Sequence, residues 1–266
     1  DGPDEVRKRA RQMLMVEGAD FLKVMAGGGT TLSLNYSATD NSVRAFTEEE
    51  MHVAVEEAER VGTTVTAHCE AYESVGPAAR AGVHVICHLG FLKPDGTRGF
   101  DEDAVRTMVK KGLYANMDMR IGVDLRDSLM EKKRRRTLTE NEKAQLDFAE
   151  FKIRHKQESV AKMLRMGVKI IASSDGIGLG NCNKLVRSLE LLVEAGMSPL
   201  EAIVAVTGRA AEATQMSGLF GTIVEGKEAD IMVVKGDPTR DISTLWSPVM
   251  VMQAGRIVVD KLSTLS

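Results

Sequence analysis

The sequence predicts an α/β protein built on a parallel sheet, followed by a smaller segment of short strands. Short apolar runs rich in β-branched residues alternate with longer helical stretches, and a glycine ends each helical stretch before the next run. Glycine is the usual residue just past a helix, because it adopts the left-handed conformation without a Cβ penalty. Helix, glycine and strand in repeated succession are typical of a sheet whose parallel strands are joined by helices.

Five segments are predicted to form the strands of this sheet. They read as nearly continuous apolar runs, which is expected when helices cover a sheet. The predicted strands are residues 20–26, 63–70, 83–90, 113–119 and 168–174, and the glycines before them are Gly18, Gly62, Gly82, Gly112 and Gly167. One helix start is well marked, since Thr47 and Glu50 have the spacing of a capping box.

The texture of the chain changes after about residue 218. Short runs separated by Gly, Asp and Pro turns predict strands at residues 221–223, 229–234, 249–253 and 256–260. These strands suggest a small antiparallel β unit appended to the α/β part. We therefore expect two domains, residues 1–217 and residues 218–266.

Composition excludes several classes of protein. The chain has 266 residues, of which 43% are hydrophobic and 27% charged, so it is not a disordered chain. A net charge of −3 argues against a nucleic-acid partner, and no apolar run approaches the roughly 20 residues of a membrane helix. The basic run 131–136 lacks interleaved aromatic residues, which favours a solvated helix end or lid loop. Three cysteines without a CxxC motif favour reduced thiols and a cytoplasmic location.

Polar residues near the ends of the predicted parallel strands mark the candidate site, because such folds place their sites there. Lys23 lies inside an apolar strand, where a buried lysine is costly unless it is paired, neutral or modified. His68 and His88 lie near the ends of the next two strands, and Asp175 ends the last one. Together these four side chains suit a metal such as zinc, although a single strand histidine is more often structural. Cys69 and Cys87 adjoin the histidines and are therefore expected to point toward the helices.

The chain resembles the amidohydrolase superfamily, most closely its imidazolonepropionase-like and prolidase-like metal-dependent hydrolases. The stretches that carry the resemblance are residues 18–28, 47–62, 65–68, 81–90, 167–176 and the tail 221–231. The resemblance implies a TIM-type (β/α)8 barrel with a small C-terminal β-sandwich segment. It also implies that Lys23 is a carboxylated lysine bridging two metals and that His68 and His88 are metal ligands. Asp175 then matches the eighth-strand aspartate, which binds metal and acts as the general base.

The family takes two further metal ligands from a His-x-His on the first barrel strand, and this sequence contains no His-x-His. The resemblance begins just before the fourth strand, so we expect only strands four to eight of the barrel. A barrel of this kind normally needs about 250 residues by itself. We therefore expect an N-terminal segment that is missing here, or a homo-oligomer, to cover the open edges.

The resemblance implies a metal-dependent amidohydrolase that cleaves an amide or related C–N bond through a metal-activated hydroxide. The substrate is expected to be a small molecule of the dipeptide or N-acyl amino acid type. The metal is expected to be divalent, zinc by preference, and binuclear in the complete enzyme. Tyr72 and Arg120, each just beyond a strand end, are candidate contacts for a substrate carboxylate. The alternative is a catalytically silent fragment of such an enzyme with a structural or assembly role.

Overall fold

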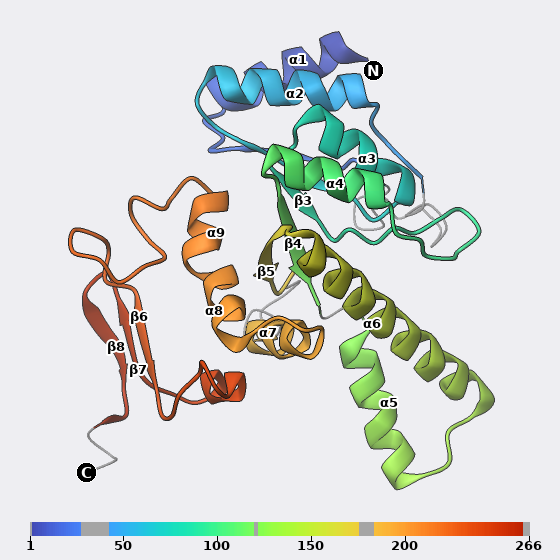
Figure 1. The fold of residues 1–266 in the computed structure, drawn as a ribbon, viewed down its shortest axis with the longest axis vertical. Helices are drawn as coiled ribbons and strands as arrows, with labels where there is room; N and C mark the ends of the chain where they lie inside the picture. The colour runs from blue at the N-terminus through green and yellow to red at the C-terminus, as the bar shows by residue number, and fades with distance from the viewer. Residues whose placement is uncertain (1, 28–42, 120–121, 176–183, 263–266) are drawn as a thin grey trace. The chain divides into compact units, whose positions relative to one another are not determined.

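The structure is a computed structural model that describes residues 2–27, 43–119, 122–175 and 184–262 (Figure 1). The chain forms two compact units that interleave along the sequence. The first unit comprises Asp1–Met117, Met163–Ile171 and Ala213–Gln215, and the second comprises Asp118–Lys162, Ala172–Glu212 and Met216–Ser266. These units are defined by how compactly residues pack in space, and each contains several separate stretches of the chain. They therefore do not test the domain boundary that the sequence predicts near residue 218, which stays a prediction.

A five-stranded sheet has most of its residues in the first unit. Its strands follow the order of the sequence and are β1 (Leu22–Val24), β2 (Val65–His68), β3 (Val85–Cys87), β4 (Tyr114–Asp118) and β5 (Lys169–Ser173). The pairs from β1 to β4 are parallel, with Lys23 opposite Thr66, Thr66 opposite Val85, and Val85 opposite Tyr114. The predicted parallel α/β fold is therefore confirmed, and each strand lies inside the run predicted for it.

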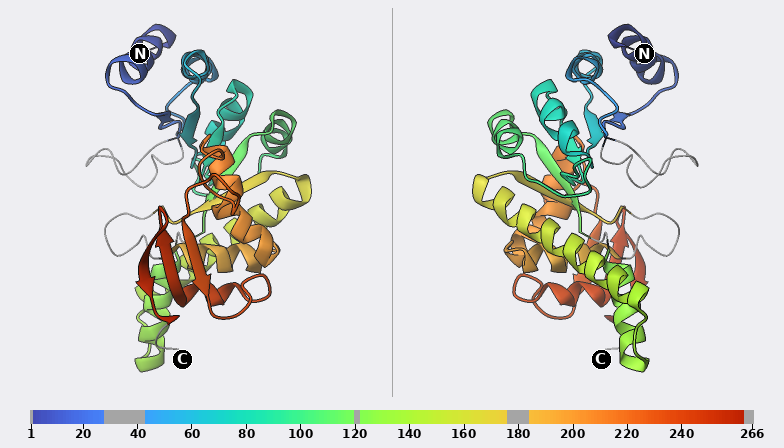
Figure 2. Two further views of the ribbon diagram at one scale, coloured as in Figure 1. Left: turned by 90° about the vertical axis from the view of Figure 1, so that its left-hand side faces the viewer. Right: turned by 90° about the vertical axis from the view of Figure 1, so that its right-hand side faces the viewer.

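Helices cover one face of this sheet. The helices α2 (Glu48–Arg60), α3 (Tyr72–Ala81) and α4 (Glu102–Lys111) pack against one another in sequence order (Figure 1, Figure 2). The capping box of Thr47 and Glu50 begins α2 as predicted, and left-handed glycines follow α3 and α4. The helix α1 (Pro3–Arg11) and the π-helical turn η1 (Gln12–Val16) precede β1, and α1 packs on α2.

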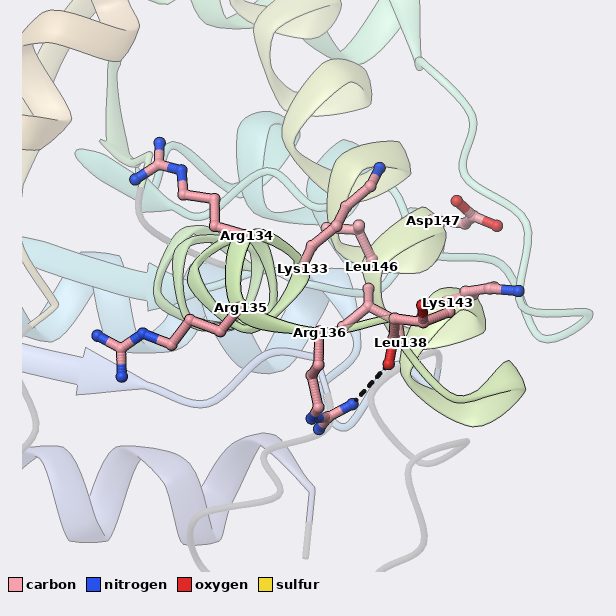
Figure 3. Close-up of a pocket in the computed structure, with 9 residues that line it drawn as sticks. Lys133, Arg134, Arg135, Arg136, Leu138, Lys143, Leu146 and Asp147 are labelled. Atoms are coloured by element: carbon pink, nitrogen blue, oxygen red, sulfur yellow. Dashed lines mark hydrogen bonds between the residues drawn. The ribbon is translucent and has the colours of Figure 1, made fainter.

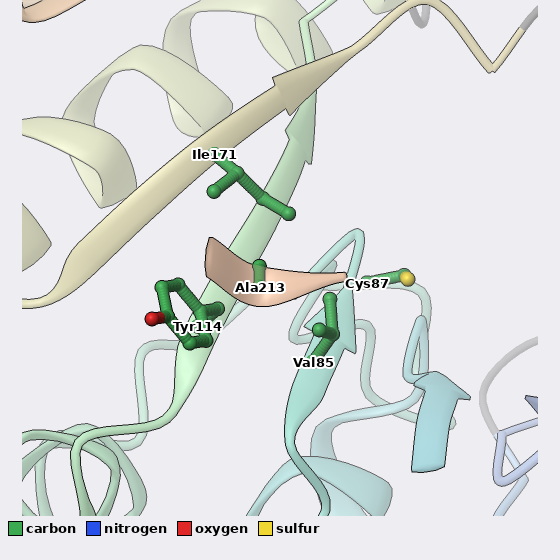
Figure 4. Packing of buried hydrophobic residues seen from close by; sticks show 5 residues of the cluster. All are labelled: Val85, Cys87, Tyr114, Ile171 and Ala213. Atoms are coloured by element: carbon green, nitrogen blue, oxygen red, sulfur yellow. The ribbon is translucent and has the colours of Figure 1, made fainter. Parts of the chain in front are cut away.

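On the other face of the sheet, side chains from three strands form a small hydrophobic cluster. Figure 4 shows these side chains, which are Val85 and Cys87 of β3, Tyr114 of β4 and Ile171 of β5. They enclose Ala213, the last residue of the helix α9 (Gly208–Ala213). Residues that are paired across neighbouring parallel strands point to the same face of the sheet. Lys23 and Thr66 are paired in register with Val85, so their side chains lie on this face too.

The second unit contains a helical hairpin, a helical pair and a small sheet. The hairpin joins α5 (Val123–Arg135) to α6 (Glu140–Met166), and Leu129, Leu138 and Leu146 close it. The helices α7 (Leu185–Glu194) and α8 (Pro199–Val206) follow, with the 3-10 helix η4 (Ile242–Trp246) packed on α7. The antiparallel sheet has the order β6 (Ile231–Val234), β7 (Pro248–Gln253) and β8 (Arg256–Asp260).

The C-terminal β segment differs from its prediction in one place. Residues 221 and 222 form bends and residue 223 has no regular structure, so no strand forms there. Gly221 has a φ of 90°, and a Cβ there would come within 2.7 Å of the Ala211 side chain, so close packing on α9 holds this turn. Among the described residues the C-terminal part thus supplies one three-stranded sheet, and a complete β-sandwich stays a prediction. No helix in the described ranges is long and apolar enough to cross a membrane.

Glu57 predicts how the stability of the first unit depends on pH. It lies buried on α2, where Arg11, Arg7 and Arg60 contact its carboxylate at 2.8 Å. The hydrogen bonds from Arg11 and then Arg7 lower the pKa of Glu57 from 4.5 to about 2. Because the folded pKa is depressed, the stabilisation is fully present above pH 4.5 and is lost as the pH falls toward 2. We expect the unfolding free energy of Glu57→Gln to depend less on pH between pH 4.5 and pH 2 than that of the wild type, as measured in acid titrations. Glu59→Gln, an exposed change on the same helix, should leave that slope unchanged.

Candidate metal centre

Lys23 and His68 lie on the same face of the sheet. Lys23 pairs with Thr66, and His68 follows Thr66 by two residues, which returns its side chain to the face of Thr66. His68 is also the last residue of β2, so it lies at the carboxyl end of its strand. This is the end of a parallel strand at which sites are expected.

His88 lies against His68. The two ring centroids are 4.5 Å apart, and the ring planes meet at 63°. His88 directly follows β3, is buried, and donates its backbone N–H to the Asn116 carbonyl of β4 at 3.0 Å. The structure therefore brings two of the four predicted metal ligands together at the ends of neighbouring strands.

Cys87 is oriented differently from its prediction. Its Sγ lies 3.5 Å from Lys23 Nζ and 3.3 Å from Thr66 Oγ1, so it faces the predicted ligands and not the helices. The alternation of side chains ends here because His88 has a φ of 70° and leaves the extended conformation. Cys69 does point toward the helices, where its Sγ lies 3.8 Å from the Ser74 carbonyl of α3. Complete burial raises the pKa of the Cys69 thiol to about 12.

The expectation that Lys23 is buried is wrong for this chain, because its side chain is exposed. β1 is the first strand in the order of the described sheet, so neighbouring strand side chains reach Lys23 from β2 and β3 only. The carboxylation of Lys23 stays a prediction that the family resemblance implies.

Asp175 lies two residues beyond β5, is exposed, and has a φ of 43°. Asp175 belongs to the second unit, as does Asp118. A carboxylate oxygen of Asp118 lies within 4.8 Å of a carboxylate oxygen of Asp175. Asp118 ends β4, is 1% exposed, and accepts a 2.8 Å hydrogen bond from Lys156 of α6. Sequence reasoning missed Asp118 and Lys156 as candidates. Asp118 could have been predicted from the sequence, because it is a carboxylate at the end of a predicted strand, which is the criterion that selected Asp175.

The structure describes one of the two predicted substrate contacts, Tyr72. Tyr72 begins α3, where its ring lies 6.3 Å from that of Phe91 and 5.3 Å from the Lys93 ammonium group. Burial, with Asp101 and Asp103 nearby, raises the pKa of the Tyr72 hydroxyl. Arg120 lies outside the described residues. A role in binding substrate stays a prediction for both.

A cavity of about 610 Å³ is lined by the basic run at the turn between α5 and α6. Figure 3 shows that Arg134 and Arg135 point away from Lys133 and Lys143. Arg136 pairs with Glu142 at 2.6 Å, and Arg134 and Arg135 pair with Glu131. The run lies at the exposed C-terminal end of α5 and three of its arginines are paired with glutamates, which agrees with the solvated helix end predicted for it.

A protein family and several solved structures match this chain. Residues 1–258 match the family described as the amidohydrolase family. Ochratoxinase from Aspergillus niger is 30% identical over 253 residues, which cover 93% of this chain and 47% of that protein. A solved Xaa-Pro dipeptidase with bound methionine is 28% identical, has a TM-score of 0.77, and is matched over 97% of this chain and 59% of its own. The solved ochratoxinase has 26% identity and a TM-score of 0.75, with 98% of this chain and 55% of that one covered. The chain thus spans about half the length of the curated relative.

Proposed function

The chain belongs to the amidohydrolase family, and we propose that it acts in the metal-dependent hydrolysis of an amide or related C–N bond. The observation that carries the proposal is the contact of the His68 and His88 rings at the carboxyl ends of β2 and β3. Two imidazoles that meet at the end of a parallel sheet are suited to bind one divalent ion. The family and the named relatives supply the class of reaction.

The proposed ligands are Lys23, His68, His88 and Asp175. Imidazole and carboxylate donors fit zinc, and a carboxylated Lys23 would add an anionic ligand from β1. A second ion, as in a binuclear centre, would need donors from a His-x-His that this sequence does not contain. The bound ion would supply Lewis acidity, which polarises a carbonyl group and lowers the pKa of bound water.

Asp175 is the proposed general base. It would accept a proton from the attacking water and then donate it to the departing amine. Its exposure and its position beyond the end of β5 leave the carboxylate open to water and substrate. The neighbouring Asp118 differs, because its carboxylate is buried and bound by Lys156. We therefore assign the proton transfer to Asp175.

The substrate class is proposed from the relatives and from the side chains around the site. An ochratoxinase and a Xaa-Pro dipeptidase are among the similar proteins, which favours a dipeptide or N-acyl amino acid. Tyr72 and Arg120 would then contact the substrate carboxylate. A homo-oligomer and a cytoplasmic location belong to the same proposal.

The competing proposal is a catalytically silent chain that serves in structure or assembly. The exposed side chain of Lys23, one of the four proposed ligands, is the observation that favours it. Metal analysis of the purified protein separates the two proposals, because a silent assembly module needs no stoichiometric divalent ion. Bound zinc together with turnover of a C–N bond would support the enzyme.

Removal of the metal is expected to lower the hydrolysis of an N-acyl amino acid or dipeptide at least about 100-fold, since Lewis acidity supplies several kcal/mol of transition-state stabilisation. Dialysis against a chelator followed by titration with Zn²⁺ measures this effect. Zn²⁺ should restore the rate in proportion to the ion bound, whereas Mg²⁺, which prefers oxygen ligands, should restore less. A rate that survives complete removal of the metal would contradict the proposal.

A further inference from the structure

The segment that follows β3 has an unusual backbone. His88, Leu89 and Phe91 have φ angles of 70°, 44° and 49°, so three residues with side chains occupy the left-handed region within a span of four. This region is unfavourable for residues other than glycine because of Cβ crowding. Such a conformation persists only when the surrounding structure holds it, and it is often found at functional sites.

Backbone hydrogen bonds join this segment to the one that follows β2. Gly90 donates its N–H to the Cys69 carbonyl at 3.2 Å, and Leu92 donates to the Glu70 carbonyl at 2.9 Å. The two segments therefore run together beyond the ends of their strands. They carry His68 at the start of one and His88 at the start of the other.

A buried ion pair joins the same two segments. Arg98 donates from Nη2 to Glu70 Oε1 at 2.7 Å and from Nη1 to the Gly90 carbonyl at 2.6 Å. The side chains of Arg98 and Glu70 are only 12% and 11% exposed. A Cβ at position 90 would lie 2.2 Å from Glu70 Oε2, so only glycine lets the carboxylate lie against this backbone. Short charge-assisted bonds with low exposure are the stronger kind of hydrogen bond.

We propose that Glu70 and Arg98 are positioning residues that fix the direction of the His88 imidazole toward His68. The direction of this ring depends on the left-handed turn, because regular alternation ends at Cys87. Arg98 holds the turn through the carbonyl of Gly90, two residues after His88, and Glu70 anchors Arg98 to the segment that follows His68. The inference rests on the proposed function in one respect, namely that His88 binds a metal ion.

The test compares Arg98→Met with Arg98→Lys and Glu70→Gln in the full chain. Arg98→Met removes both hydrogen bonds, while Arg98→Lys keeps the charge but cannot donate in a fork. The matched control is Arg7→Met, because Arg7 also pairs with a buried glutamate of the first unit, at 2.8 Å, but lies on α1. Amide hydrogen exchange over residues 88–92, C2-hydrogen exchange of the His88 ring, and Zn²⁺ affinity by calorimetry are measured for each variant.

We expect Arg98→Met to speed amide exchange at Leu89, Gly90 and Leu92, to change the exchange rate of the His88 ring, and to weaken Zn²⁺ binding by about 10–100-fold. Arg98→Lys should restore part of each effect, and Arg7→Met should show none of them. If Arg98→Met is unfolded, Arg98→Lys and Glu70→Gln carry the comparison, with reduced effects in the same direction.

The measurements separate the inference from the proposed function. If the wild-type chain binds no Zn²⁺, the proposed function fails, and a changed exchange rate of the His88 ring in Arg98→Met still supports positioning. Amide and ring exchange equal to the wild type would overturn the inference. So would Zn²⁺ binding that weakens no more in Arg98→Met than in Arg7→Met, because Glu70 and Arg98 would then serve stability alone.

Discussion

Replacing either His68 or His88 with alanine is expected to lower kcat/KM for C–N bond hydrolysis by at least about 1,000-fold, corresponding to roughly 4 kcal/mol of lost transition-state stabilisation. The two rings lie 4.5 Å apart at the ends of neighbouring strands, so each variant removes one donor from the same proposed ion. Zn²⁺ affinity should fall together with the rate. Steady-state kinetics and metal analysis of the same preparations measure both effects.

His52→Ala is the matched control for these variants. His52 lies on α2 with 58% of its side chain exposed, 3.5 Å from Glu56 and away from the strand ends. Its loss should change neither the rate nor the Zn²⁺ content by more than about twofold, as for most exposed substitutions. The metal-centre proposal would have to be withdrawn if His68→Ala and His88→Ala retained stoichiometric Zn²⁺ and the wild-type rate.

Local signals explain why the fold was predictable from the sequence. Glycines after helices and apolar runs between them report on the conformation of neighbouring residues, and those signals place all five strands of the parallel sheet. Local sequence signals do not indicate which distant segments pack against a given residue. Residues 221–223 read as a strand, yet the close packing of Gly221 on Ala211 requires a turn.

The candidate site was predictable only in part, because side-chain direction and burial depend on distant segments. Regular alternation predicts that Cys87 faces the helices, but His88 has a φ of 70° and breaks that alternation, so Cys87 faces the predicted ligands. The burial of Lys23 was assumed from its apolar neighbours in sequence, whereas exposure depends on which strands flank β1. Asp118 and Lys156 are 38 residues apart, and no local pattern links them.

The pair of Asp118 and Lys156 predicts the largest effect on stability. The two side chains are 1% and 10% exposed, and Lys156 Nζ donates to Asp118 Oδ1 at 2.8 Å. Removing one partner of a buried pair costs about 3–5 kcal/mol, because the remaining charge has lost both water and its counterion. Lys156→Met keeps the length and apolar volume of the side chain, so we expect it to lower the unfolding free energy by that amount in urea titrations.

The double variant Lys156→Met with Asp118→Leu shows whether the loss comes from the stranded charge or from packing. Replacing both members of a buried pair with apolar residues is often neutral or stabilising, so the double variant should recover most of the stability lost in Lys156→Met. Lys143→Met, at the exposed pair with Glu140, should cost no more than about 1 kcal/mol. A double variant as unstable as Lys156→Met would mean that the alkyl chain or the shape of this site matters more than its charge. If the double variant regains stability but hydrolyses the substrate more slowly than the wild type, then Asp118, within 4.8 Å of Asp175, also serves the site.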